Sequence, residues 1–107
     1  MHTLILLAAL SSQITFKTTQ DGAQTTIIPQ VTLTQSCQCQ VQMRFVRKGK
    51  GGESTSVQRN NLSIPANRPI DLSRLRINIE PSDSVTLIVT VSDGQSLNLT
   101  QQWPPSE

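Results

Sequence analysis

The chain has 107 residues, a formal net charge of +2 at pH 7 and only 15% charged residues. This length fits a single domain, and a domain of this size folds without a metal or a disulfide. The small charge argues against nucleic acid as a partner, and two Phe and one Trp are too few for a base-stacking surface. Ser, Thr and Gln take the place of charged residues, which favours strands with hydroxyl and amide outer faces.

An apolar run over residues 4–10 is followed by Ser11 and Ser12. Its length is typical of the apolar region of a secretory signal peptide and far below the roughly 20 residues of a membrane helix. No Lys or Arg precedes the run, so an apolar first strand of the domain is the alternative. We predict a signal peptide over residues 1–10, one domain over residues 11–107 and no stable insertion into a membrane.

Apolar and polar residues alternate with a period of two along the rest of the chain, the pattern of half-buried strands. The alternation begins in residues 14–17 and resumes in residues 26–34. Pro29 interrupts the second segment, and we expect a bulge or a sheet edge there because proline cannot donate to a β-ladder.

The clearest alternation covers residues 37–45. One parity holds two cysteines and three apolar residues, and the other holds three glutamines and an arginine. Such a strand turns the cysteines and the apolar side chains toward the core and the glutamines away from it. The glycine-rich residues 48–52 that follow are expected to form a flexible basic loop.

Further strands are expected after this loop, bounded by turn residues or prolines. They cover residues 55–64, 75–79, 85–91 and 97–103, with residues 65–69 crossing between sheets and residues 85–91 as the central strand. About seven short strands at this spacing predict an all-β fold, an immunoglobulin-like β-sandwich of antiparallel strands.

The residues needed for hydrolytic catalysis are missing. The only histidine, His2, lies within the predicted signal peptide, so no Ser–His or Cys–His pair remains after cleavage. The acidic residues fall mostly at turns and form no evident acid–base couple. Two cysteines without a histidine make a poor zinc site, which needs four ligands. We predict that the protein is not an enzyme and binds no metal and no cofactor.

The first candidate site is the segment from Cys37 to Cys39. Residues two apart in an extended strand point to the same face, with Cα atoms about 6.6 Å apart. A disulfide tolerates about 4.4–6.8 Å between Cα atoms but requires closer Cβ atoms, so a bond here needs a kink and would be labile and redox-active. The alternative is a pair of buried, inert thiols that pack as small hydrophobes.

The second candidate site is a group of basic residues near the predicted loop: Arg44, Arg47, Lys48 and Lys50. Such a group is often only the solvated tip of a hairpin. Alternatively, it forms a positive patch that steers an acidic, unfolded partner toward the protein.

Three segments, residues 1–20, 31–39 and 89–105, carry a family resemblance, most specifically the stretch from Ser-Asp-Gly-Gln-Ser to Gln-Gln-Trp-Pro-Pro. In them the chain resembles the CsgC family of curli assembly proteins. The resemblance implies an immunoglobulin-like periplasmic protein that keeps the curli fibre subunit from polymerising prematurely. It also implies a Cys-x-Cys pair with suggested redox activity, carried here by Cys37 and Cys39.

The chain departs from the family pattern beside the cysteines, where Gln38 and Gln40 replace an apolar residue and an arginine. Losing an adjacent cation removes one reason for a low thiol pKa. We therefore predict a monomeric binding module that engages unfolded or nascent fibre subunit, with other curli assembly proteins as further partners. A thiol–disulfide protein acting through Cys37 and Cys39 is the alternative.

Overall fold

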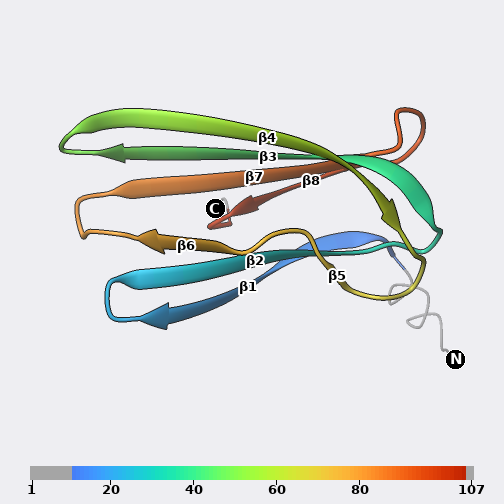
Figure 1. The fold of residues 1–107 in the computed structure, drawn as a ribbon, viewed down its shortest axis with the longest axis horizontal. Helices are drawn as coiled ribbons and strands as arrows, with labels where there is room; N and C mark the ends of the chain where they lie inside the picture. The colour runs from blue at the N-terminus through green and yellow to red at the C-terminus, as the bar shows by residue number, and fades with distance from the viewer. Residues whose placement is uncertain (1–10, 106–107) are drawn as a thin grey trace, which may run out of the picture.

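The computed structural model describes residues 11–105, which form strands and connections without a helix. The described strands are β1 (Gln13–Asp21), β2 (Gln24–Thr32), β3 (Cys37–Gly49), β4 (Gly52–Ile64), β5 (Ile70–Asp71), β6 (Leu75–Asn78), β7 (Ser84–Ser92) and β8 (Asn98–Trp103) (Figure 1). The predicted signal peptide lies outside the described residues. Within them, no helix is long and apolar enough to cross a membrane.

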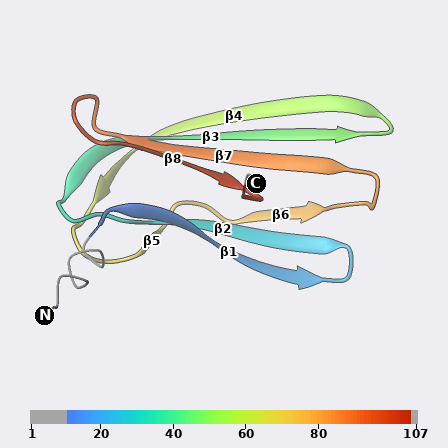
Figure 2. The same ribbon diagram turned by 180° about the vertical axis from the view of Figure 1, so that it is seen from behind.

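The strands form two antiparallel sheets that lie face to face as two layers (Figures 1 and 2). In one sheet β2 lies between β1 and the short strands β5 and β6, and the other has the order β4-β3-β7-β8. The predicted all-β antiparallel fold is confirmed, with the two-residue β5 raising the number of described strands to eight. The immunoglobulin-like topology stays a prediction. Residues 65–69 do cross between the sheets, as expected, because they join β4 to β5.

The core lies between the layers and comes mainly from β2, β3 and β7, whose alternate residues point inward. The fully buried apolar side chains on these strands include Ile27, Val31, Val41, Leu87, Val89 and Val91. Each such side chain stabilises the fold by about 1.5–3 kcal/mol relative to an exposed position. The expected central place of β7 is confirmed, because it lies between β3 and β8.

The expectation of a bulge or an edge at Pro29 is wrong. Pro29 is fully buried and lies opposite Phe16 in an unbroken register between β1 and β2. On its other side β2 pairs with β6 up to Ile27 and with β5 from Gln30, so Pro29 faces the interruption between them. Its carbonyl accepts a hydrogen bond of 2.8 Å from the N–H of Leu72. A proline fits inside this sheet because its missing N–H has no ladder partner to lose.

The expectation of a flexible loop over residues 48–52 is also wrong. β3 runs to Gly49 and β4 begins at Gly52, which is its direct partner, so only Lys50 and Gly51 form the turn. Gly52 has a φ of 116°, a conformation that glycine adopts without steric cost. Two-residue connections match the twist of paired strands, so these glycines shape a tight hairpin rather than a mobile loop.

An ion pair ties the two layers together near this hairpin. Arg47 on β3 donates to the carboxylate of Asp83 at 2.8 Å and to the backbone carbonyl of Asn78 at the end of β6. The side chain of Asp83 is only 10% exposed and also accepts the N–H of Glu80. A Cβ at Gly49 would overlap the Asp83 carboxylate, so the close approach requires glycine.

The Asp83 carboxylate should make folding stability depend on pH. Hydrogen bonds from the Glu80 N–H and from Arg47 hold the pKa of Asp83 below its ordinary value of 3.8. A carboxyl whose pKa falls on folding stabilises the native state above its unfolded pKa, and this contribution disappears as pH falls through the lowered pKa. We expect Asp83→Asn to be less stable than the parent at pH 7, with the gap closing between about pH 5 and pH 2.

Urea unfolding of both proteins across this pH range measures that gap. Asn keeps one acceptor oxygen for the Glu80 N–H, so the comparison isolates the charge that faces Arg47. A gap that stays constant from pH 7 to pH 2 would contradict the assignment.

Candidate functional site

The outer face of the β4-β3-β7-β8 sheet carries the glutamines of β3. Strand pairing extends each glutamine into a row of amide and hydroxyl side chains across the sheet. We call this surface the amide face; its members are Gln38, Gln40, Gln42, Asn61, Ser63, Thr90, Ser92, Asn98 and Thr100. The expectation that the glutamines point away from the core is confirmed, since Gln38 and Gln40 are exposed and Gln42 is partly so.

Cross-strand hydrogen bonds order part of the amide face. The hydroxyl of Ser63 donates to the side-chain carbonyl of Gln38 at 2.9 Å, and Nε of Arg59 donates to that of Gln42 at 2.8 Å. Both glutamines keep the donor capacity of their amide nitrogens, because these bonds use only their oxygens. The face therefore offers an array of amide donors and acceptors in register with the strands.

The four predicted basic residues do not lie on one surface. Arg44 and Lys48 lie exposed on the outer face of β3, and Lys50 lies exposed in the turn beyond them. Arg47 has the opposite parity, points between the layers and is engaged by Asp83. A strand places neighbouring residues on opposite faces, so a run of basic residues does not form one patch.

Sequence reasoning missed one cation of this face, Arg59 on β4. It pairs across from Gln42, one row from Arg44, so the two guanidinium groups are diagonal neighbours on the same surface. The turn at Lys50 and Gly51 was the signal that could have found it, because a two-residue hairpin sets the register of β4 against β3. We call the exposed cations the basic strip, formed by Arg44, Lys48, Lys50 and Arg59.

The charge of the basic strip is nearly unopposed on its own sheet. Glu53, directly opposite Lys48, is the only acidic residue in β3, β4, β7 and β8. Around Arg44 the neighbouring side chains are Val57 and Ile88, which bring no negative charge. This surface is therefore suited to carboxylates on a partner.

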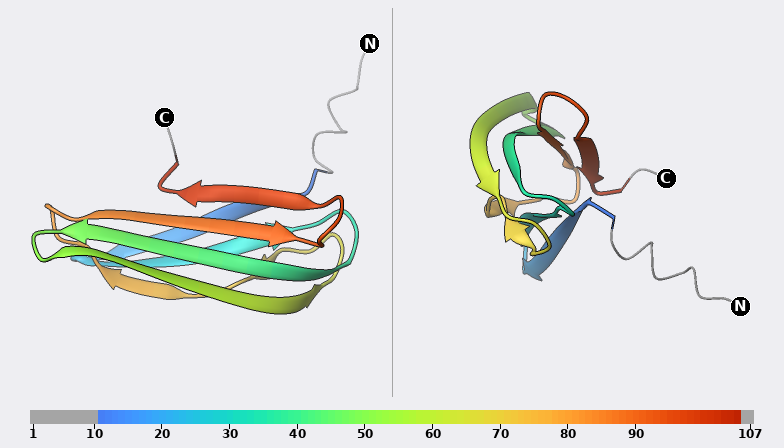
Figure 3. Two further views of the ribbon diagram at one scale, coloured as in Figure 1. Left: turned by 90° about the horizontal axis from the view of Figure 1, so that it is seen from above. Right: turned by 90° about the vertical axis from the view of Figure 1, so that its right-hand side faces the viewer.

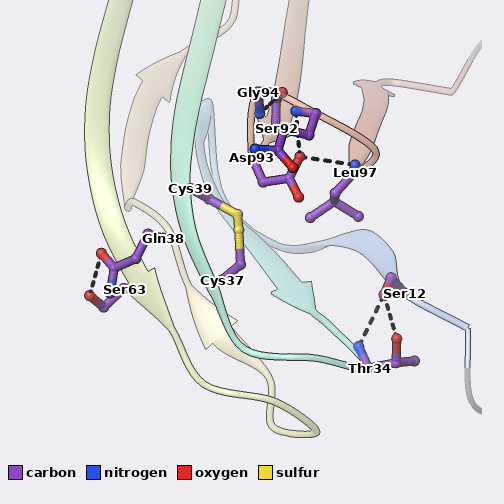
Figure 4. Close-up of a disulfide and its surroundings, with 11 residues drawn as sticks. Ser12, Thr34, Cys37, Gln38, Cys39, Ser63, Ser92, Asp93, Gly94 and Leu97 are labelled. Carbon is purple, nitrogen blue, oxygen red and sulfur yellow. Dashed lines mark hydrogen bonds between the residues drawn. A yellow bond between two sulfur atoms is a disulfide. The ribbon is translucent and has the colours of Figure 1, made fainter.

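Cys37 and Cys39 form a disulfide at the start of β3 (Figure 4). Their Cα atoms are 5.3 Å apart, closer than in a fully extended strand, as the geometric argument requires for a bond between them. The two cysteines share a parity, but Cys39 is buried and Cys37, the first residue of β3, is only half-buried. The alternative of two buried free thiols does not describe this structure.

The carboxylate of Asp93 lies near the disulfide (Figure 4). Asp93 lines a hollow with Cys39 on one side and a second hollow with Cys37 on the other. Hydrogen bonds from the N–H groups of Gln95 and Leu97 lower the pKa of Asp93, so it is ionised at neutral pH. Among the described residues that line these hollows, none is Lys, Arg or His.

This environment opposes thiolate chemistry. The thiolate is the reactive form of cysteine, and a fixed negative charge nearby disfavours it while a cation or a helix N-terminus would favour it. The disulfide can accept electrons from a partner dithiol, but the reduced pair would be a weak nucleophile. The amide face and the basic strip need no such activation to bind.

Comparison with known proteins assigns the chain to a family. Residues 5–103 match the Tafi-CsgC family, described as thin aggregative fimbriae synthesis protein. The chain is 66% identical to the curli assembly protein CsgC of Salmonella typhimurium over 99% of its own length and 98% of that protein. It is 63% identical to the curli assembly protein CsgC of Escherichia coli, over 99% and 96% of the two chains.

Two solved structures have a similar fold. The E. coli curli protein CsgC in its SeCys form superposes with a TM-score of 0.85 at 61% identity, covering 89% of this chain and all of that one. CsgH of R. palustris, at 13% identity and a TM-score of 0.63, shares the fold over 83% of this chain and 89% of its own. From the family match and the identity along nearly the full length, the chain belongs to the CsgC family of curli assembly proteins.

Proposed function

We propose that the protein binds the curli fibre subunit in the periplasm, while that subunit is unfolded or nascent, and delays its polymerisation. The observation that carries this proposal is an exposed sheet face of amide and hydroxyl groups beside a nearly unopposed basic strip. Membership in a family of curli assembly proteins supplies the class of partner.

The chemistry of the face suits a chain that is about to enter a fibril. Cross-β fibrils stack extended segments through backbone bonds and through ladders of Asn and Gln side chains. The amide face offers the same groups on a folded scaffold, and the basic strip attracts carboxylates on the arriving chain. Such a polar contact buries little apolar surface and is short-lived, which fits a protein that delays assembly without retaining the subunit.

Removing charge from the basic strip should weaken the delay. Arg44→Gln combined with Arg59→Gln removes two cations while keeping an amide at each position, and electrostatic steering changes association rates by about tenfold or more. We expect this variant to lose most of the parent's lengthening of the lag time. We also expect its residual effect to depend less on salt, since charges are screened over about 8 Å at physiological ionic strength.

A matched control removes the same charge elsewhere. Arg68→Gln combined with Arg76→Gln takes two exposed cations from outside the amide face and should leave the delay intact. Lag times of subunit polymerisation across a salt series measure both variants, with circular dichroism as the check on folding. Equal delay by the two double variants would exclude the basic strip from the contact.

A second candidate function is thiol–disulfide exchange, favoured by the half-buried Cys37 in a disulfide. A thiolate of a reduced partner would attack the Cys37 sulfur and release Cys39 as the leaving thiolate. A second thiol of that partner would then displace Cys37, leaving the partner oxidised and this pair reduced. The ionised Asp93 beside the pair makes this the weaker candidate.

The two candidates differ in their need for sulfur. Cys37→Ser combined with Cys39→Ser removes a bond that closes a very short loop, so we expect a stability loss below about 2 kcal/mol. The delay of polymerisation should be unchanged in this variant. Loss of the delay in a protein that remains folded by circular dichroism would favour the exchange function instead.

The reactivity of the reduced cysteine pair tests whether the charge of Asp93 disfavours the thiolate. At neutral pH the reduced pair should react slowly with a thiol reagent, and Asp93→Asn should speed the reaction, because it removes the charge that opposes the thiolate. Asn keeps an acceptor oxygen for the loop N–H groups of Gln95 and Leu97. Equal labelling rates in the two proteins would show that Asp93 does not control the pair.

A further inference from the structure

The strand β4 is a long sheet edge that is open on both of its faces. Residues 52–61 are exposed at every position, including the parity that points toward the other layer. Val57, at 48% exposure, is an exposed large hydrophobic residue of the described chain. Figure 3 shows β3 and β4 extending as a hairpin along one side of the molecule. The opposite sheet therefore does not cover this part of β4.

The other sheet edges are shorter, and β1, with nine residues, is continuously exposed only over residues 17–21. β5 and β6 are strands of two and four residues, and β8 has six residues before Pro104 and Pro105. β1 and β8 contact each other where the two layers meet (Figure 3). Long open edges invite pairing with another chain, and most proteins shorten or cover them. β4 departs from that rule.

The direction of the backbone groups of β4 follows from the ladder. The N–H of Asp93 donates to the carbonyl of Leu97 beside β8, so odd-numbered residues of β7 direct their backbone groups to β8. In antiparallel sheets this direction alternates along each strand. Even-numbered residues of β7 therefore bond β3, and odd-numbered residues of β3 bond even-numbered residues of β4. The odd-numbered residues of β4 are left with N–H and C=O groups that point outward.

In the exposed stretch 52–61, the backbone groups left without a partner among the described residues belong to five residues, Glu53, Thr55, Val57, Arg59 and Asn61. They span nine consecutive positions without a proline, which is long enough to pair with an added strand of ordinary length. Their side chains lie on the outer surface of the sheet, the same surface as the amide face. The intervening Ser, Gln and Asn side chains lie on the opposite surface.

The polarity and charge of these side chains determine which kind of strand can pair with the β4 edge. An added strand would meet mainly hydroxyl and amide groups on both of its faces, with Val57 as the one apolar side chain among residues 53–61, so an amphipathic strand would find little apolar surface to bury. Apart from Glu53 at the hairpin end, the charge along the edge is the cation Arg59, with Arg44 on the neighbouring strand. The matching segment is polar on both faces and carries a carboxylate opposite Arg59.

We propose that β4 is a docking strand, to which an extended polar, carboxylate-bearing segment of the polymerising partner adds as a further antiparallel or parallel strand. This inference rests on the proposed function and specifies its contact. Backbone hydrogen bonds supply the affinity, as in other cases of strand addition, and Arg59 and the amide face supply the selectivity. A segment held there has one of its two backbone edges occupied, so no further subunit adds at that edge.

A proline at an outward-pointing position tests the docking strand. Val57→Pro removes an N–H that does not bond β3, and edge strands tolerate proline at such positions. The matched control Val57→Thr changes the side chain to a similar volume and keeps the N–H. We expect Val57→Pro to return the lag time of curli fibre subunit polymerisation to that of the subunit alone, whereas Val57→Thr should delay as the parent does.

The outcomes separate the two levels of the proposal. Equal delay by the parent and Val57→Pro would overturn the docking strand and leave the proposed function standing. No delay by the parent itself would overturn both. Loss of delay in both variants would assign the effect to the apolar side chain and would also overturn the docking strand.

Amide hydrogen exchange gives a second test, independent of whether Val57→Pro folds. In the free parent, the five outward N–H groups should exchange much faster than those of Ser54, Ser56, Gln58 and Asn60, and excess unpolymerised subunit should slow exchange at the outward set. Unchanged exchange in a mixture that shows delay would overturn the proposal. So would concentration-dependent protection in the parent alone, because it would identify a second copy as the occupant.

Discussion

The burial of one row of β3 between the layers is the constraint on which the rest of the structure depends. Cys39, Val41 and Met43 are buried at alternate positions, so β3 has a single permitted orientation. A slip of one residue would carry this row to solvent and bring glutamines into the core. Because β3 pairs with both β4 and β7, its orientation also sets which residues of those strands face outward. Because the apolar residues of β3 must face the core, the glutamines between them must face outward and form the amide face.

Groups that stabilise the sandwich and groups available to a partner are separated by this alternation. Inward-pointing positions of β3 end in the disulfide at one end and in Arg47 with its partner Asp83 at the other. Outward-pointing positions hold Arg44 and the glutamines, which neither the core nor an ion pair requires. Substitutions on the outer face should therefore change binding with little effect on folding, which makes the proposed contact accessible to mutation.

An open sheet edge can serve binding, but it can also lead to self-association. The same unpaired backbone that could accept a partner segment could also pair with another copy of this chain. Apart from Val57, the exposed positions of β4 are polar on both faces, so a second copy would gain little apolar burial by pairing there. Arg59 favours an extended polar segment that carries a carboxylate, so the edge can select by charge what it admits.

The sequence by itself determined the all-β class, the inward and outward faces of β3, the central place of β7 and the resemblance to a curli assembly family. These depend on local period-two patterns and on residue identity. It did not determine the accommodation of Pro29, the hairpin at Lys50, the isolation of Arg47 from the other cations, the place of Arg59 beside Arg44, or which of the two states the cysteine pair adopts. Each of these depends on which strand lies alongside and in what register. Alternation tells which face a side chain occupies, but only the folded sheets bring distant strands together and decide what that side chain meets.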